Sequence, residues 1–193
     1  LNDHVNQLSH YLLEDNKVTT GDLIAIKLDR SQWIVVAIIA VLKVGGAYLP
    51  IDPEHPKERT DFILRDSKCK FIIDKYIIET FKKKSKNYST ESLSTKVKPH
   101  YLAYVIYTSG STGVMIQHSN TYAFIKWCHE EFAKDEFDVV YGVTSICFDL
   151  FIFELFFSLT IGIKMKLLEN GFSIKNHLLT DQKVLLNTVP SVT

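Results

Sequence analysis

The feature that most constrains this chain is an apolar run, Leu102–Tyr107, that breaks abruptly into hydroxyls and glycines. The run is β-branched and aromatic, short enough for a strand and apolar at every position, which predicts an inner strand of a parallel sheet. In the loop that follows, Gly110 and Gly113 permit backbone angles and close approaches that a Cβ would forbid. Short hydroxyls beside free backbone N–H groups form a concavity that suits a polyphosphate. The candidate phosphate-binding residues are Thr108, Ser109, Gly110, Ser111, Thr112 and Gly113.

A plain turn is the competing interpretation of the same loop. Gly, Ser and Thr cluster in ordinary turns, each for local backbone reasons. The stretch also lacks the Gly-Lys-Ser/Thr ending of a Walker loop and the Gly-x-Gly-x-x-Gly of a dinucleotide fold. The residue types alone therefore leave both interpretations open.

Strands and helices alternate through the first half of the chain. Apolar spacing and turn residues predict helices at 1–14, 31–44 and 56–66, strands at 21–28, 47–51 and 70–74, and a polar surface connection at 82–98. Ser31 is the expected N-cap of the second helix. This alternation predicts an α/β layered sheet with right-handed crossovers, in which ligands bind beyond the carboxyl ends of strands. A helix predicted from Ser119 to Phe132 is expected to place its N-terminus near the glycine-rich loop.

A second candidate site lies where a strand predicted at 139–146 leads into an aromatic helix predicted at 148–157. The aromatic residues of this helix recur at helical spacing, which is more typical of a core than of a pocket. Asp149 stands between Phe148 and Leu150, and such a carboxylate is either a helix N-cap or a buried charge kept for a cationic partner. The residue chemistry alone favours the cap. Further strands are predicted at 164–168 and 184–192.

Charge and hydropathy exclude several classes of partner. The 22 basic and 22 acidic residues balance, so neither nucleic acid nor an anionic membrane is an expected partner. The beginning of the chain lacks the basic region, apolar core and cleavage site of a secretory leader. The longest apolar run, Trp33–Val44, is interrupted by Lys43 and is shorter than the ~20 residues that a membrane span needs.

The isolated thiols and imidazoles of the chain do not form a reactive set. Cys69, Cys128 and Cys147 are odd in number and far apart, which fits reduced thiols in a cytoplasmic protein rather than disulfides or a metal site. His118 is expected to be structural and His129 to lie on the surface. No Ser/His/Asp or Cys/His constellation and no metal ligands are evident.

Two stretches resemble signatures of one known family. Ala103–Gly113 resembles the phosphate-loop signature of the adenylate-forming enzymes, specifically of the adenylation domains of nonribosomal peptide synthetases, and Leu42–Pro53 resembles a structural signature of the same family. The resemblance implies the layered parallel-sheet α/β large lobe of these enzymes. It covers nearly all of residues 1–193 but only the front of the family domain. The later motifs and the small C-terminal lobe are expected to be absent.

One departure from the family pattern concerns the loop itself. In the family the signature continues Gly-x-Pro-Lys-Gly before a Val-Met-Ile-(Glu/Gln)-His segment, whereas here Gly113 runs straight into Val114–His118. Four residues, including the loop lysine, are absent. Either the chain carries a deletion that should cripple ATP binding, or the sequence omits a mobile loop. The intact flanks favour the omitted loop, because disorder concentrates in exposed glycine-rich tips.

The resemblance also implies roles around the second candidate site. Asp149 corresponds to the aspartate that holds the α-ammonium of an amino-acid substrate. Leu150 and Phe153 correspond to side-chain-specificity positions, Phe148 to a packing residue at the pocket wall, and Val192 to a residue that lines the pocket.

The implied activity is ATP-dependent amino-acid activation with Mg²⁺, which yields aminoacyl-AMP and pyrophosphate. The aminoacyl group then passes to the phosphopantetheine thiol of a peptidyl carrier domain, beside condensation domains, in nonribosomal peptide and antibiotic biosynthesis. No catalytic residue is expected in this chain, and the chain alone is expected to be inactive. The alternatives are an acyl-CoA or other carboxylate ligase of the same fold, against which Asp149 argues, and a non-catalytic nucleotide-binding module. The activated amino acid stays open.

Overall fold

The structure, a computed structural model, describes residues 1–108, 112–132, 135–169, 173–178 and 183–188. The chain divides into two compact units, residues 1–119 and residues 120–193. Each unit is built on a sheet of its own.

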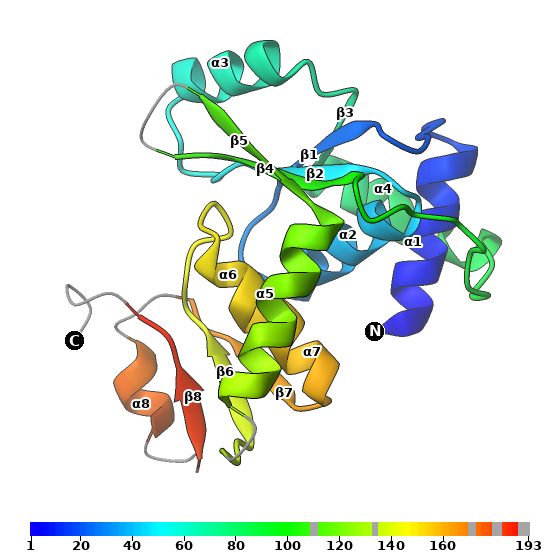
Figure 1. The fold of residues 1–193 in the computed structure, drawn as a ribbon. Coiled ribbons are helices and arrows are strands. Elements are labelled where there is room, and N and C mark those ends of the chain that lie inside the picture. Colours follow the sequence, from blue (N-terminus) through cyan, green and yellow to red (C-terminus); the bar gives the residue numbers. More distant parts are fainter. Residues whose placement is uncertain (109–111, 133–134, 170–172, 179–182, 189–193) are drawn as a thin grey trace. The chain divides into compact units, whose positions relative to one another are not determined.

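The sheet of the first unit has the strand order β3-β1-β2-β4-β5 (Figure 1). Its strands are β1 (Leu23–Lys27), β2 (Ala47–Pro50), β3 (Phe71–Asp74), β4 (Leu102–Tyr107) and β5 (Gly113–Gln117). Strand β1 pairs parallel with β2 and β3, and β2 pairs parallel with β4, whereas β5 pairs antiparallel with β4. The predicted layered α/β sheet and the internal position of β4 are confirmed, with one antiparallel strand added at the edge.

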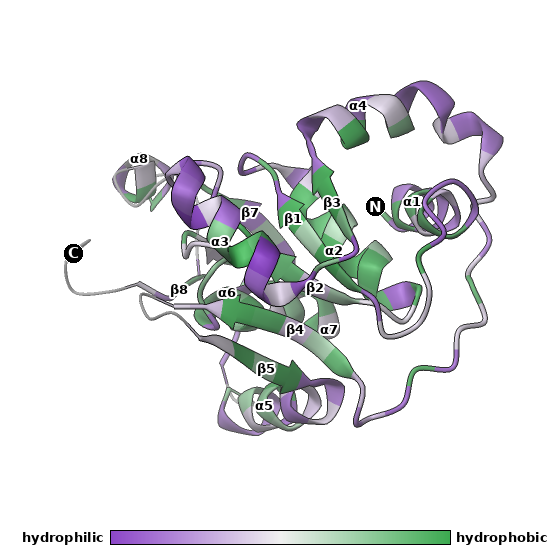
Figure 2. Cartoon of the chain, turned by 90° about the horizontal axis from the view of Figure 1, so that it is seen from above, coloured by the Kyte–Doolittle hydropathy of each residue, from purple (hydrophilic) through white to green (hydrophobic). Residues whose placement is uncertain are grey.

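Helices cover both faces of this sheet. They are α1 (Asn2–Glu14), α2 (Gln32–Lys43), α3 (Lys57–Ser67) and α4 (Lys75–Lys84), followed by a 3₁₀ turn, η1 (Ser85–Asn87). Helix α3 lies on one face, and α1, α2 and α4 lie on the other (Figure 1). The Ser31 side chain accepts a hydrogen bond from the Trp33 N–H at 3.3 Å, which confirms the predicted N-cap of α2. Figure 2 shows that α2 and the central strands are mostly hydrophobic, which is why they form the interior of the unit.

The core beneath α3 ties this helix to the strand that leads into the glycine-rich loop. Ile63 of α3 packs with Ala25, Leu49, Val105 and Tyr107 in one buried cluster. Full burial of an aliphatic side chain contributes roughly 1.5–3 kcal/mol, so Ile63 fixes α3 firmly over the end of β4.

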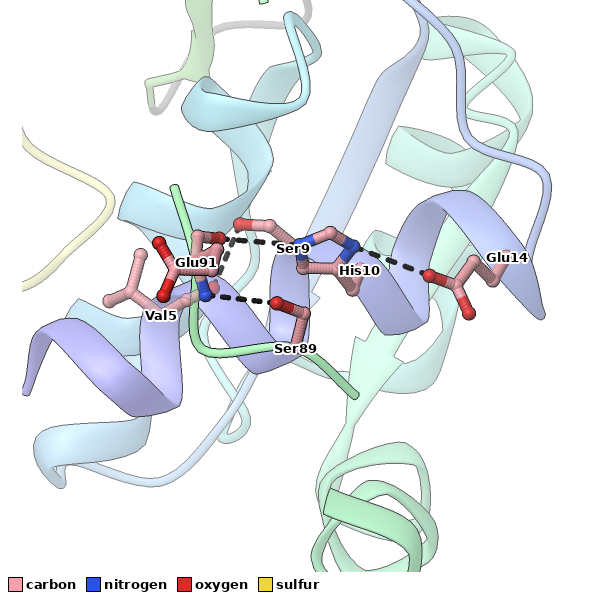
Figure 3. Close-up of polar contacts among 6 residues, drawn as sticks. All are labelled: Val5, Ser9, His10, Glu14, Ser89 and Glu91. Atoms are coloured by element: carbon pink, nitrogen blue, oxygen red, sulfur yellow. Dashed lines mark hydrogen bonds and ion pairs between the residues drawn. The ribbon is translucent and has the colours of Figure 1, made fainter. Parts of the chain in front are cut away.

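The segment before β4 is held against α1 rather than lying free on the surface. The His10 ring bridges the Glu14 carboxylate and the Glu91 backbone carbonyl, with 3.3 Å to each (Figure 3). Asn6 donates to the Thr90 carbonyl at 2.6 Å. The connection predicted at 82–98 also starts later than expected, because α4 extends to Lys84.

The second unit contains a three-stranded parallel sheet of order β7-β6-β8. Its elements are α5 (His118–Glu131), which begins at the end of the first unit, β6 (Val139–Gly142), α6 (Leu150–Ile152), the π-helical turn η2 (Phe153–Phe157), α7 (Ser158–Ile161), β7 (Lys164–Leu167), α8 (Ile174–Leu178) and β8 (Val184–Leu186). Strand β6 ends at Gly142, earlier than the predicted 139–146. Phe153 and Phe157 form a core with Ile125 and Cys128, as the helical spacing of the aromatic residues predicts.

Within the described ranges, no helix combines the length and the apolar character required to cross a membrane.

Candidate functional site

The glycine-rich loop lies in the sequence between the two paired strands of an antiparallel hairpin. Tyr107, the last residue of β4, pairs with Gly113, the first residue of β5, so residues 108–112 link the two strands. Thr108 and Thr112 are exposed at the two ends of this loop. The predicted phosphate-binding residues Ser109, Gly110 and Ser111 lie outside the described residues.

Helix α5 does not begin at the loop, so the expectation that its N-terminus lies there is wrong. Strand β5 carries the chain back along β4. The His118 N–H donates to the Tyr101 carbonyl at 3.0 Å, and the Ser119 N–H donates to the Pro99 carbonyl at 2.8 Å. Both acceptors precede β4, whereas the loop follows it. A phosphate at the loop would therefore rely on groups other than the α5 N-terminus.

Gly113 is required by packing between the two strands of the hairpin. A Cβ at this position would lie 2.8 Å from Cε2 of Tyr107 and 2.9 Å from Cγ1 of Val105, closer than real Cβ atoms approach other atoms. The close approach predicted for Gly113 is therefore present, but in the described structure it is an approach to neighbouring side chains.

The four residues that follow this glycine in the family signature are absent from the chain, in which Val114 comes directly after Gly113. Gly113 and Val114 are consecutive residues of β5, paired with Tyr107 and Ile106, in a continuous sequence of 193 residues. The omitted-loop interpretation favoured by the intact flanks is therefore wrong, and the deletion is a property of this protein. The loop is short and its sequence carries no cationic side chain.

Two charged residues of α3 contact the end of β4 at the loop. Nη2 of Arg59 donates to the backbone carbonyl oxygen of Thr108 at 2.5 Å. The Tyr107 hydroxyl donates to Oδ2 of Asp66 at 2.5 Å. Burial and the neighbouring Asp66 carboxylate raise the pKa of Tyr107 to about 12. Both contacts fix the junction of strand and loop relative to α3.

Sequence reasoning missed Arg59 and Asp66, although topology offered a signal. Helix α3 follows β2, and β2 is the parallel neighbour of β4. Because the carboxyl ends of parallel strands meet at one edge of a sheet, the first turn of the helix after β2 lies at the edge where the loop follows β4. Arg59 lies in that turn.

Asp149 stands at the N-cap position of α6 without acting as a cap. Its side chain makes no capping hydrogen bond, and its backbone is already helical, with φ −62° and ψ −29°. An N-cap residue normally has an extended backbone and a side-chain oxygen that accepts from the first turn. Asp149 is also exposed. The Asp149 carboxylate is therefore neither bonded as a cap nor buried in this structure, and its use for a cationic partner stays a prediction.

The other predicted substrate residues fall into different environments. Phe148 is 57% exposed and Leu150 is 37% exposed, so with Asp149 they form one exposed segment. Phe153 is 8% exposed and belongs to the core. Val192 lies outside the described residues.

Glu154 is a buried residue that sequence reasoning did not single out. Its side chain is fully buried, and Oε1 accepts hydrogen bonds from the Thr144 hydroxyl at 2.6 Å and from the Thr144 N–H at 3.2 Å. The Phe148 N–H in turn donates to the Ser145 carbonyl at 3.0 Å. Glu154 therefore holds one end of the segment that displays Asp149. The sequence did contain a signal for this residue, because Glu154 lies among aromatic residues that are expected to be buried. A glutamate is rarely buried unless it is paired.

The remaining thiols and imidazoles are separate from each other. Cys69, Cys128 and Cys147 form no disulfide with one another. His129 is exposed, as predicted, with Nε2 2.8 Å from the Thr160 hydroxyl oxygen. Burial lowers the pKa of His118, and the structural role expected for this residue stays a prediction.

Comparisons with known proteins identify the family and the fold of this chain. The family model described as "AMP-binding enzyme" matches residues 1–192. One of the subunits of linear gramicidin synthase from Brevibacillus parabrevis is 35% identical over 209 residues, a match that covers 99% of this chain and 4% of that protein. Bacitracin synthase 1 of Bacillus licheniformis is 34% identical over 199 residues, covering 100% of this chain and 4% of that protein. The chain thus spans a small part of the length of these curated relatives.

Two solved structures share the fold. A four-domain nonribosomal peptide synthetase, holo-AB3403 bound to AMP and glycine, has a TM-score of 0.80 and 22% identity, covering 99% of this chain and 16% of that chain. The AMPPNP-bound form of the nonribosomal peptide synthetase FmoA3 has a TM-score of 0.77 and 23% identity, covering 86% of this chain and 19% of that chain. These matches extend the fold similarity through both units.

Proposed function

The chain belongs to the AMP-binding enzyme family, with peptide-synthetase relatives, and on this premise we propose that it serves in ATP-dependent activation of an amino acid. The amino-acid carboxylate attacks the α-phosphate of ATP, which forms aminoacyl-AMP and releases pyrophosphate. Transfer of the aminoacyl group to the phosphopantetheine thiol of a peptidyl carrier domain, beside a condensation domain, is part of the proposal. The observation that carries it is the glycine-rich loop at the carboxyl end of β4 in a chain that matches this family along its length.

The nucleotide is proposed to place its phosphates at the loop. The exposed Thr108 and Thr112 hydroxyls fit this role, because hydroxyls and loop N–H groups donate to phosphate oxygens. A resident metal fits the chain less well. Among the residues described, no group of three or more His, Cys, Asp and Glu side chains could hold a metal ion. Mg²⁺ is therefore expected to arrive with the nucleotide, and no step is assigned to it.

Asp149 is proposed to bind the α-ammonium of the substrate. Its exposure and its missing cap bond support this role, because the carboxylate is not used by the helix that it precedes. An ammonium group taken out of water without a paired carboxylate costs several kcal/mol. Phe148, Leu150, Phe153 and Val192 are proposed to select the substrate side chain. Because Phe153 is packed in the core, the exposed Phe148 and Leu150 are expected to contribute most.

Residues 1–193 are proposed to be part of the large lobe of an adenylation domain, and we expect that this chain by itself does not form adenylate. The family's adenine and ribose motifs and its catalytic lysine have no counterpart in these residues. The cytoplasmic location suggested by the separate cysteines stays a prediction.

A second candidate function is favoured by the deletion in the loop. Without the four residues after Gly113, including a lysine, the loop offers fewer groups to the β- and γ-phosphates. A non-catalytic nucleotide-binding or docking module would tolerate this loss.

One hybrid protein tests the two functions against each other. Residues 1–193 replace the matched segment of an adenylation domain of bacitracin synthase 1, and ATP–pyrophosphate exchange is measured across amino acids, fatty acids and aryl acids. A companion variant inserts Thr-Pro-Lys-Gly between Gly113 and Val114. Exchange with an amino acid in either form supports activation of amino acids. Exchange only with non-amino carboxylates supports the acyl-ligase alternative, and no exchange in either form supports the non-catalytic module.

A further inference from the structure

In the second unit, helix α5 lies alongside α6 and the π-helical turn that follows it (Figure 1). The Phe132 ring of α5 contacts the Phe157 ring, with 5.5 Å between their centroids. About two turns earlier on α5, the Phe124 ring contacts the Phe153 ring at 6.5 Å. Earlier positions on α5 therefore face earlier positions on the neighbouring helix. The first half of α5 thus lies toward the end that carries Asp149.

Phe153 lies one helical turn after Asp149. The backbones of both residues are helical, with φ and ψ of −62° and −29° at Asp149 and −60° and −55° at Phe153. Residues four apart in a helix share one face, and a helical side chain leans back over the preceding turn. The Phe153 ring therefore leans toward Asp149. Because Phe153 is almost fully buried, a ligand held at Asp149 would meet the rings that pack on Phe153.

Phe124 and Trp127 form an aromatic surface beside this turn. The two rings lie within 11° of parallel, with 6.2 Å between their centroids. Phe124 is half-buried against Phe153, whereas Trp127 is 52% exposed. The pair therefore leads from the core to the surface. Phe and Trp have only two side-chain torsions each, so rings packed in this way bind a ligand at a low cost in conformational entropy.

Core packing accounts for Phe124 but not for Trp127. A single exposed apolar side chain needs no functional explanation. Here, however, the exposed indole stacks on the ring that reaches Phe153, one turn from an exposed carboxylate that makes no capping bond. A carboxylate next to a flat aromatic surface complements a molecule that carries an ammonium group and a ring.

We propose that Phe124 and Trp127 bind the side chain of the substrate, and that this side chain is aromatic. The inference rests on the proposed function in one respect, the binding of the α-ammonium by Asp149. An aromatic side chain gains ring–ring contact in addition to the burial of its area, whereas a branched aliphatic side chain gains burial alone. Phe124 and Trp127 are then specificity residues contributed by α5, in addition to those of the 148–153 segment.

The two tryptophans of the chain allow a direct test in the 193-residue protein. Trp127 lies at the proposed surface, whereas Trp33 lies in the first unit and is an internal control. The indole N–H resonances of nitrogen-15-labelled protein are followed by NMR and assigned with Trp127→Phe. The probes are phenylalanine, leucine, which lacks the ring, and 3-phenylpropionate, which lacks the ammonium group. This comparison of ligands in the wild type depends on no variant.

Three variants identify the groups that bind the probes. Phe124→Leu removes one ring and keeps an apolar side chain, and Asp149→Ala removes the carboxylate. Tyr122→Leu is the matched control, because Tyr122 is an aromatic residue of the same helix that is 72% exposed and lies outside the Phe124–Trp127 pair. Thermal unfolding checks the fold of each variant.

Phenylalanine is expected to shift the Trp127 resonance saturably and to leave the Trp33 resonance in place. Leucine and 3-phenylpropionate are each expected to bind about tenfold more weakly, which corresponds to about 1.4 kcal/mol. Phe124→Leu should reduce the preference for phenylalanine over leucine to about threefold or less, whereas Tyr122→Leu should keep it within about twofold of the wild type. Asp149→Ala should remove the preference for phenylalanine over 3-phenylpropionate.

Other results would overturn the inference. If phenylalanine and leucine bind equally and Asp149→Ala weakens both, the amine site of the proposed function stands and the aromatic assignment fails. If 3-phenylpropionate binds as tightly as phenylalanine, the ligand is an aryl carboxylate and the amino-acid inference fails. If no probe shifts the Trp127 resonance, Phe124 and Trp127 do not line a substrate site. The proposed function is then still decided by ATP–pyrophosphate exchange in the hybrid protein.

Discussion

Replacement of Asp149 by alanine should leave the helix that follows it intact, and a matched aspartate in the same chain provides the standard. Asp74 caps α4: its backbone is extended, with φ −113° and ψ −174°, and its Oδ1 accepts from the Ile77 N–H at 2.9 Å. Loss of such a cap costs about 1 kcal/mol. Asp149 makes no corresponding bond and is exposed, so its loss should change local stability by less than about 0.5 kcal/mol.

Amide hydrogen exchange measures both helices separately, which is necessary because Asp74 and Asp149 belong to different units. Asp74→Ala should accelerate exchange of residues 75–84 about fivefold, the factor that corresponds to about 1 kcal/mol. Asp149→Ala should leave exchange of residues 150–161 within about twofold of the wild type. If instead the two substitutions accelerate exchange of their helices equally, Asp149 is a helix cap, and its proposed use for a ligand loses its structural support.

Three further substitutions probe the contacts around the two candidate sites. Gly113→Ala should lower the free energy of unfolding by about 1–3 kcal/mol in urea titrations, because the added Cβ would lie 2.8 Å from the Tyr107 ring; an unchanged midpoint would contradict this packing. Because the pKa of Tyr107 is raised from 10.0 to about 12 beside Asp66, its contribution to stability is complete below pH 10 and is lost as the pH rises toward 12. In Tyr107→Phe that part of the pH dependence should vanish, and identical profiles for the two proteins between pH 10 and 12 would show that the pKa shift is absent. Glu154→Ala should destabilise the second unit by about 1–3 kcal/mol, because the half-buried Thr144 N–H and hydroxyl lose this carboxylate as an acceptor, and unchanged exchange of the 150–161 helix would refute that role.

The local sequence was sufficient to predict a helix or strand where the burial of its side chains alone determines the structure. The strand Leu102–Tyr107 and the helix Gln32–Lys43 are so uniformly apolar that an internal strand and a covered helix are the available solutions, and both were predicted. The strand Gly113–Gln117 was missed because the four-residue deletion brings the loop directly against it, so that it could not be separated from the loop and helix on either side. Because this strand was missed, the N-terminus of α5 was wrongly expected to lie near the loop, although the first residue of the helix was predicted to within one position.

The polar contacts at the candidate sites could not be predicted from local sequence. Arg59 reaches Thr108 across 49 positions of the chain, and only the pairing of β2 with β4 brings them to one edge. A cap was predicted at Asp149 because aspartate is common at the starts of helices. In the structure the backbone of Asp149 is already helical, and its side chain makes no capping hydrogen bond. Both cases depend on three-dimensional geometry rather than on residue type.

The most direct test of amino-acid activation compares wild-type and Asp149→Ala forms of the hybrid adenylation domain, each with Thr-Pro-Lys-Gly inserted after Gly113, in ATP–pyrophosphate exchange across a panel of amino acids. We predict strong exchange with one amino acid or a few similar ones in the wild type, and a loss of about tenfold or more in the variant, since an unpaired ammonium costs several kcal/mol. Equal exchange by the two proteins, or exchange by the wild type only with carboxylic acids that lack an amino group, would contradict amino-acid activation through Asp149.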